Sequence, residues 1–245
     1  MKAPALSALM SADSRLLWRD PLLAWVLLLP LGLAALFRVL IPRLGEALSV
    51  AIGFDLAAYY PLIMGGYLMT APGIVGMVVG FLLLDERDER TLSALRVTPL
   101  SMRRYLAYRV TLPLLAGTAT TLVGYPLVGL ARLPLTTLLP IAAVAALSAP
   151  SLALVLATAA PNKVAGFAVV KLLNVINLLP IVAFFVPPPL QYVAGVLPAF
   201  WPMRALWSAA AGDPFVTYLL VGSIVGAAAI AIVAALFDRR LLRRA

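Results

Sequence analysis

Residues 85–109 read DERDERTLSALRVTPLSMRRYLAYR and form a long polar stretch in an otherwise apolar chain. Apolar runs long enough to cross a bilayer flank this stretch on both sides. Its acidic residues and arginines are Asp85, Glu86, Asp88, Glu89, Arg87, Arg90, Arg96, Arg103, Arg104 and Arg109. A segment with so many charges must lie in water, and its excess of arginine favours the cytoplasmic side of a membrane.

The charged stretch is expected to hold two short helices with a break between them. A residue that precedes proline is pushed out of the α region, so Thr98-Pro99 ends the first helix. Thr98 then suits the N-cap of a second helix, with Pro99 as its first residue. On this pattern alone, a solvated loop that only sets the topology is the alternative.

The amino-acid sequence of this stretch resembles the cytoplasmic loop of type-2 ABC exporter permeases. That family has Glu-Arg-Glu-x-Gly-Thr-Leu-Glu, a short apolar stretch and then Thr/Ser-Pro. Arg90 stands where glycine is usual, and Ser93 stands where a second glutamate is usual. The resemblance implies a coupling helix that docks on a separate ATPase subunit. The residues expected to carry this coupling are Glu86, Arg87, Glu89, Thr98, Pro99, Arg103 and Arg104.

Composition identifies an integral membrane protein. Of the 245 residues, 63% are hydrophobic and 12% are charged, whereas soluble domains average about 25% charged residues. The net charge of +9 does not indicate nucleic-acid binding, because the basic residues lie beside the ends of the spans instead of forming one patch.

Several kinds of chemistry are excluded by the residues that the chain lacks. It has no cysteine and no histidine, which excludes disulfides, thiol nucleophiles and imidazole catalysis, and most zinc or haem ligation. It also lacks a GxxxxGK[ST] phosphate loop. We therefore expect a transport subunit, not an enzyme. No cofactor or metal is expected in this chain, with ATP and Mg on the partner ATPase.

Glu86 and Glu89 are expected to form ion pairs with basic residues of a partner or of the same loop. They lie in a charged segment and not in an apolar pocket, so acid catalysis through a raised pKa is not expected. At a wet surface, loss of such a pair costs only about 0–1 kcal/mol of stability. The alternative is that both are solvated side chains that stop the helix from sliding into the bilayer.

Hydropathy predicts an all-α integral membrane fold, a single permease domain over 1–245 with six transmembrane helices. The spans are expected in 21–84, 110–186 and 214–237, at about 21–41, 58–84, 110–131, 136–160, 164–186 and 214–237. An outer loop is expected at 42–57. Gly76 with Gly80, and Gly222 with Gly226, form GxxxG pairs that permit close packing of helices.

Three segments outside the spans complete the expected architecture. Residues 1–20 suit an elbow helix that lies on the membrane surface. Residues 187–213 suit two short outer re-entrant helices, which match a pair in the family, or an ordinary aromatic-belt loop. The basic tail at 238–245 and the arginines of 85–109 lie on the same side, so both termini are predicted to be cytoplasmic in a bacterial plasma membrane.

Polar residues in the fifth span suggest a transport path. Lys171, Asn174 and Asn177 fall within about a third of the helix circumference, together with Lys163. Polar side chains within a bilayer usually face other helices or water, so these three residues are expected to line a translocation path between two permease subunits. Alternatively, Lys171 snorkels to the inner interface and the asparagines bond neighbouring helices.

The resemblance implies the membrane subunit of a bacterial exporter that moves an amphiphilic, drug-like molecule outward. Its partners are expected to be an ABC ATPase subunit, a second permease subunit (identical or sister), membrane lipid and the exported substrate, with no nucleic acid. Permeases for lipid, glycan or haem export remain alternatives, as does a non-transporting membrane scaffold. An intramembrane protease is not expected, since histidine is absent and no two aspartates lie within the spans.

Overall fold

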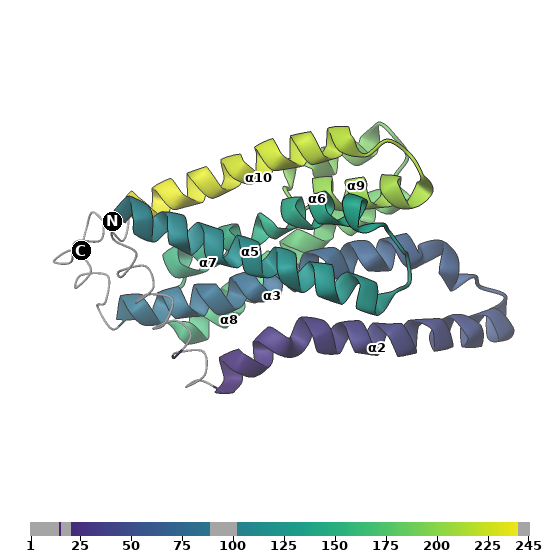
Figure 1. Cartoon of the computed structure of the whole chain (residues 1–245), viewed down its shortest axis with the longest axis horizontal. Helices are drawn as coiled ribbons and strands as arrows, with labels where there is room; N and C mark the ends of the chain where they lie inside the picture. The colour runs from purple at the N-terminus through teal and green to yellow at the C-terminus, as the bar shows by residue number, and fades with distance from the viewer. Residues whose placement is uncertain (1–14, 16–20, 89–101, 240–245) are drawn as a thin grey trace.

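A computed structural model describes residues 15, 21–88 and 102–239 of the chain (Figure 1). Every regular element within these residues is a helix. Six stretches there are long and apolar enough to cross a membrane. The predicted all-α fold with six spans is therefore confirmed. Except for Arg15, which is helical, the predicted elbow helix at 1–20 lies outside the described residues.

The first span is longer than predicted. Helix α2 covers Pro21–Ile52 and runs through Pro42, so the expected outer loop at 42–57 is largely helical. Gly53 ends the helix with a φ of 67°, and its N–H donates to the carbonyl of Ser49 at 3.0 Å. The prediction of an outer loop at 42–57 was wrong because a helix that projects out of the apolar layer tolerates the charged residues after Pro42. Helix α2 ends only at Gly53, which adopts the left-handed conformation.

Helix α3, Tyr60–Asp88, is the central element (Figure 1). A short 3₁₀ helix, η1 (Leu56–Tyr59), precedes it, and the carboxylate of Asp55 caps η1 by accepting the N–H of Ala57 at 2.9 Å. Most of α3 is buried. The helices that pack against it are α2, α5 (Met102–Val128), α7 (Ser148–Ala159), α8 (Lys163–Leu178) and α9 (Phe200–Ala211). Its apolar residues therefore run around the whole helix instead of forming one stripe.

Glycines bring α3 and α7 (Ser148–Ala159) close together. A Cβ on Gly76 would lie 2.5 Å from the carbonyl oxygen of Ala149, and a Cβ on Gly80 would lie 2.7 Å from the side chain of Leu156. The predicted role of this GxxxG pair in close packing is thus confirmed. The second pair faces α6–α7 and α9, with Gly222 against Val144 and Trp201, and Gly226 against Leu147.

The middle of the chain forms the remaining neighbours of α3. Helix α5 covers Met102–Val128, and α6 covers Leu135–Ala146. The fourth span consists of α6 and α7, which meet at Leu147. Helix α8, Lys163–Leu178, continues as the 3₁₀ helix η2, Leu179–Phe185. The change occurs next to Pro180, because proline has no N–H to continue the α-helical ladder.

Two short helices precede the last span, α10 (Val216–Phe237). They are η3, Leu190–Val196, and α9, Phe200–Ala211, and Trp201 joins them by donating its ring N–H to the carbonyl of Gly195 at 2.9 Å. Two short helices were predicted in this region. Their insertion into a membrane interface stays a prediction.

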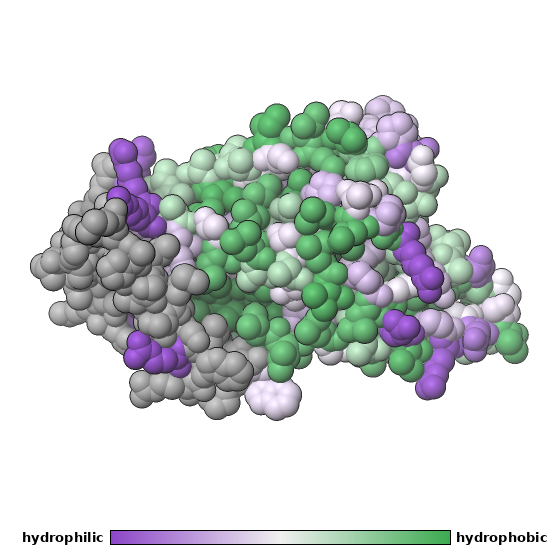
Figure 2. Space-filling model, in the orientation of Figure 1, coloured by the Kyte–Doolittle hydropathy of each residue, from purple (hydrophilic) through white to green (hydrophobic). Residues whose placement is uncertain are grey.

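The helices run between two polar ends. We call one the loop end, where α3 ends at Asp88 and α5 begins at Met102, and the other the far end, where η3 and α9 lie (Figure 1). Figure 2 shows hydrophobic residues over the middle of the molecule and hydrophilic residues at both ends. Large apolar side chains are exposed on α2, α8 and α10, among them Trp25, Leu36, Phe167, Leu172, Leu220 and Ile224. This distribution suits a protein surrounded by lipid.

Candidate functional site at the loop end

The last turn of α3 carries four consecutive charged residues, Asp85 to Asp88. Successive residues of a helix point about 100° apart, so neighbouring side chains here reach different helices. Asp85 contacts α8, Glu86 contacts α5, and Arg87 contacts the end of α7. One helical turn thus joins α3 to three neighbours at the loop end.

Glu86 is buried in this arrangement, with 6% of its surface exposed. One carboxylate oxygen accepts the hydroxyl of Tyr105 at 2.6 Å, and the other forms an ion pair with Arg109. The guanidinium of Arg109 is fully buried and lies over the rings of Tyr105 and Tyr108, at 5.4 and 5.3 Å from their centroids. A buried charge is tolerated when it is paired and hydrogen-bonded in this way.

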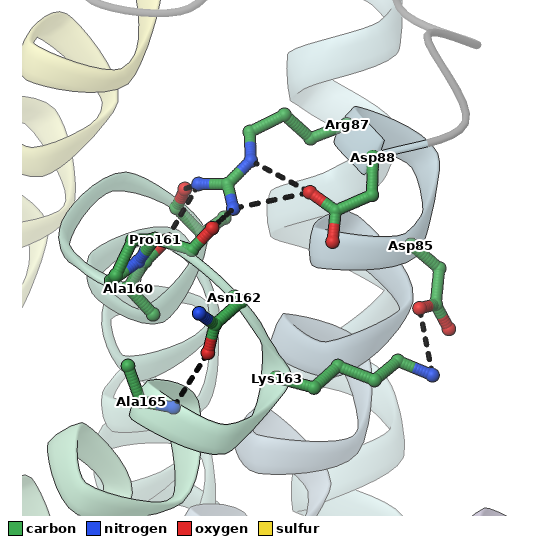
Figure 3. A network of polar contacts seen from close by, with 9 residues as sticks. Asp85, Arg87, Asp88, Ala160, Pro161, Asn162, Lys163 and Ala165 are labelled. Atoms are coloured by element: carbon green, nitrogen blue, oxygen red, sulfur yellow. Dashed lines mark hydrogen bonds and ion pairs between the residues drawn. The ribbon is translucent and has the colours of Figure 1, made fainter.

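Arg87 caps the end of α7, as Figure 3 shows. It donates to the carbonyls of Ala157, Ala160 and Pro161 at 3.1, 2.7 and 2.9 Å, and to the carboxylate of Asp88 at 3.3 Å. The last carbonyls of a helix lack partners within it and carry partial negative charge. The planar guanidinium, with several donors in one fork, satisfies them together.

The turn from α7 to α8 is held from its other side as well (Figure 3). The ammonium of Lys163 lies 2.8 Å from the carboxylate of Asp85. Asn162 caps α8, because its side-chain oxygen accepts the N–H of Ala165 at 2.9 Å. Together with Arg87, these contacts attach the start of the fifth span to the end of α3. We call Asp85, Glu86, Arg87 and their partners the α3 clamp.

The predicted coupling residues lie in different environments in the structure. Glu86 and Arg87 belong to the clamp, whereas Arg103 and Arg104 are exposed at the start of α5. Glu89, Thr98 and Pro99 lie outside the described residues. The expectation of a wet surface was wrong for Glu86, because α5 supplies Tyr105 and Arg109 to bury it. The two ends of the predicted loop at 85–109 are thus parts of α3 and α5.

Tyr105 and Arg109 were missed as site residues. Arg109 was counted only among the loop arginines, although the four-residue spacing places both side chains on one face of a helix. That spacing, next to a carboxylate at the end of the preceding span, was the available signal. Their pairing with Glu86, which is 19 residues from Tyr105 and 23 from Arg109 in sequence, has no local signal.

A second polar feature lies between α3 and α8. Asn174 and Asn177 are half-buried and line a cavity of about 130 Å³ together with Thr70 of α3. Asn177 also lines a neighbouring cavity of about 90 Å³, which reaches α7 and α10. The hydroxyl of Thr70 donates to the carbonyl of Gly66 in its own helix. Neither asparagine amide is hydrogen-bonded to another described residue, so both can bond water or a guest molecule.

The basic residues of α8 lie apart from this cavity. Lys171 is exposed and lines neither cavity, and Lys163 belongs to the α3 clamp. Within one subunit the structure therefore brings Asn174 and Asn177 together and leaves Lys171 outside. A place for Lys171 on the same path requires a second subunit against α8.

Comparison with known proteins identifies the family. A family model described as "Fluoroquinolones export permease protein Rv2686c-like" matches residues 13–234, which include the whole α3 clamp and both cavities. The chain belongs to this family of export permeases. The predicted resemblance to a drug-exporter-like ABC permease is thereby confirmed.

Curated relatives of the permease come from Mycobacterium tuberculosis. Fluoroquinolones export permease proteins MT2760 (strain CDC 1551 / Oshkosh) and Rv2686c (strain ATCC 25618 / H37Rv) are each 34% identical to it over 238 residues. The match covers 96% of this chain and 93% of each relative. No solved structure matches the chain.

Proposed function

We propose that this chain is the membrane subunit of a bacterial ABC exporter that moves amphiphilic, drug-like molecules outward. The observation that carries the proposal is the match to the fluoroquinolone export permeases over nearly the full length of both chains. Fluoroquinolones are accordingly the first substrates to test. Energy comes from a separate ATPase subunit, which binds ATP and Mg.

The ATPase acts on the segment between α3 and α5. Residues 89–101 join these helices, and the contacts at the base of the segment are the buried pair of Glu86 and Arg109. A push on the segment therefore moves the ends of α3 and α5 together. The α3 clamp passes this movement to α7 and α8, because Arg87 and Asp85 hold the turn between them. Glu89, Thr98, Pro99, Arg103 and Arg104 are the proposed contacts with the ATPase.

The substrate passes along α8, between this subunit and a second permease subunit, identical or sister. Asn174 and Asn177 supply hydrogen-bonding groups at the cavity between α3 and α8. Lys171, exposed on the single subunit, faces the second one. The loop end is cytosolic in this arrangement, because it carries the arginine-rich segment, and both termini lie on the same side of the plasma membrane.

Transport into inverted vesicles tests the proposal. The chain is co-expressed with an ABC ATPase from a neighbouring reading frame, and uptake of a fluoroquinolone is measured with and without ATP. We expect ATP-dependent uptake that is lost when the phosphate-loop lysine of the ATPase is replaced, and no ATP hydrolysis by the rigorously purified chain alone. Uptake that needs no ATPase, or hydrolysis by the chain alone, would contradict the proposal.

A further inference from the structure

A cluster of polar side chains lies at the far end, where η3, α9 and α10 meet. The guanidinium carbon of Arg204, on α9, lies 5.2 Å from the centroid of the Tyr218 ring, on α10. The hydroxyl of Tyr218 lies 3.2 Å from the hydroxyl of Tyr192, on η3. Three helices thus bring a cation and two hydroxyl groups to one place.

Arg204 has no anionic partner in this cluster. It is half-buried, and its Nε is buried without a hydrogen-bond partner. No carboxylate in the described parts of the chain lies within ion-pair distance of it. Half-buried Arg87 and fully buried Arg109 differ, because both are paired with acidic residues. Arg204 is half-buried and interacts with two tyrosine hydroxyls and a tyrosine ring, but with no counter-ion. Because an enclosed charge without a counter-ion is unfavourable, an anionic group from outside the chain would stabilise it.

The groups around the guanidinium of Arg204 are the ring of Tyr218 and the hydroxyl groups of Tyr218 and Tyr192. A guanidinium only donates hydrogen bonds, and phenolic hydroxyls are able to donate. A ligand that brings oxygen acceptors and negative charge therefore matches the cluster.

We propose that Arg204, Tyr218 and Tyr192 form a binding site for an anionic oxygen group, a phosphate or a carboxylate. Such groups form the strong hydrogen bonds that guanidinium geometry favours. Two sources share this chemistry: the phosphate of an anionic lipid headgroup, and the carboxylate of a molecule that leaves the permease. The site itself does not depend on the proposed transport function; only the second source does.

Two soluble probes separate the sources. Dioctanoyl phosphatidylglycerol represents the lipid phosphate, with dioctanoylglycerol as its uncharged match. Benzoate represents an aromatic carboxylate, with benzamide as its uncharged match. Binding to the detergent-purified chain is measured by native mass spectrometry for the lipids and by the shift in unfolding temperature for all four. We expect at least one anion to bind and neither uncharged match to do so, and the anion that binds identifies the source.

Variants of the chain locate the binding. Arg204→Gln is expected to weaken binding of that anion by about tenfold or more, since hydrogen bonds to charged groups are the strong ones. Arg204→Lys should weaken it less, and Tyr192→Phe gives a second, milder test if Arg204→Gln fails to fold. Arg132→Gln, at an exposed arginine, should bind as the wild type does. The proposal is overturned if neither anion binds the wild-type chain, or if the folded Arg204 variants bind as tightly as Arg132→Gln.

Discussion

Glu86 and Arg109 form an ion pair that is enclosed between α3 and α5, with both side chains buried. They stand 23 residues apart in the sequence, on either side of the segment 89–101. The pair therefore joins the two helices that this segment connects in the sequence. Under the proposed function, a force on this segment would act on the ends of both helices together.

The pair is expected to stabilise the fold. Arg109→Met leaves the carboxylate of Glu86 buried without its cation, which should cost about 3–5 kcal/mol. Thermal unfolding of the purified chain in detergent measures the change. Arg104→Met is the matched control, because Arg104 is exposed in the same helix. Adding Glu86→Gln to Arg109→Met should restore part of the stability; equal stability of Arg109→Met and the control would contradict the burial of the pair.

Arg87 is expected to hold the α7–α8 turn through its shape as well as its charge. Arg87→Lys keeps the charge, but an ammonium cannot serve the carbonyls of Ala157, Ala160 and Pro161 in one plane. We expect a loss of about 1–3 kcal/mol and faster amide hydrogen exchange around Lys163. Arg103→Lys, at an exposed position, should change neither. Unaltered exchange in Arg87→Lys would show that the charge alone suffices.

Gly76 is expected to set the distance between α3 and α7. In Gly76→Ala the new methyl group meets the backbone of Ala149 at 2.5–2.9 Å, and neither helix can move without disturbing its other contacts. Overpacking of this kind costs about 1–3 kcal/mol. Gly32→Ala is the control, since nothing lies within 4 Å of the added Cβ, and alanine is the better helix former. The unfolding temperature should fall for the first variant and hold or rise for the second.

Asn177 is expected to affect transport and not stability. Its amide makes no hydrogen bond to another described residue, so Asn177→Leu removes no hydrogen bond among the described residues. Vesicle uptake should show a change of about tenfold in substrate affinity if the amide bonds the substrate. A normal affinity would remove Asn177 from the path.

Lys171→Met tests whether Lys171 faces a second permease subunit or the membrane surface. The variant should insert at least as well as the wild type, because an intramembrane lysine is costly. A changed transport rate is expected if α8 faces a second subunit. Normal transport of several substrates would mean instead that Lys171 reaches the membrane surface.

The topology is testable because the chain has no native cysteine. Ser93→Cys should not react with an impermeant thiol reagent added outside intact cells, since the arginine-rich segment is expected in the cytosol. Arg132→Cys, in the exposed turn between α5 and α6, should react. Labelling in the reverse pattern would invert the proposed orientation.

Local chemistry was enough for much of the fold. Six apolar runs predicted six spans, and Gly76 and Gly80 predicted a close helix contact because a missing side chain permits it wherever the partner lies. Pro180 disturbs the α-helix of the fifth span for a local reason too, since the lost N–H is a property of the residue itself. These features depend on residues near in sequence, so no knowledge of the tertiary arrangement was needed.

The sequence by itself determined that this chain crosses a membrane six times and which segments do so, because transfer into lipid depends on composition over about twenty residues. Only the tertiary structure decided where the charges at 85–88 and 103–109 lie. Glu86 looked solvated because its neighbours in sequence are charged, yet its neighbours in space are Tyr105 and Arg109. Likewise, Lys171 and Asn177 share a helix, but packing against α3 gives a cavity to the asparagine alone. Burial of a side chain is set by the helices that pack around it, and hydropathy along one helix does not contain that information.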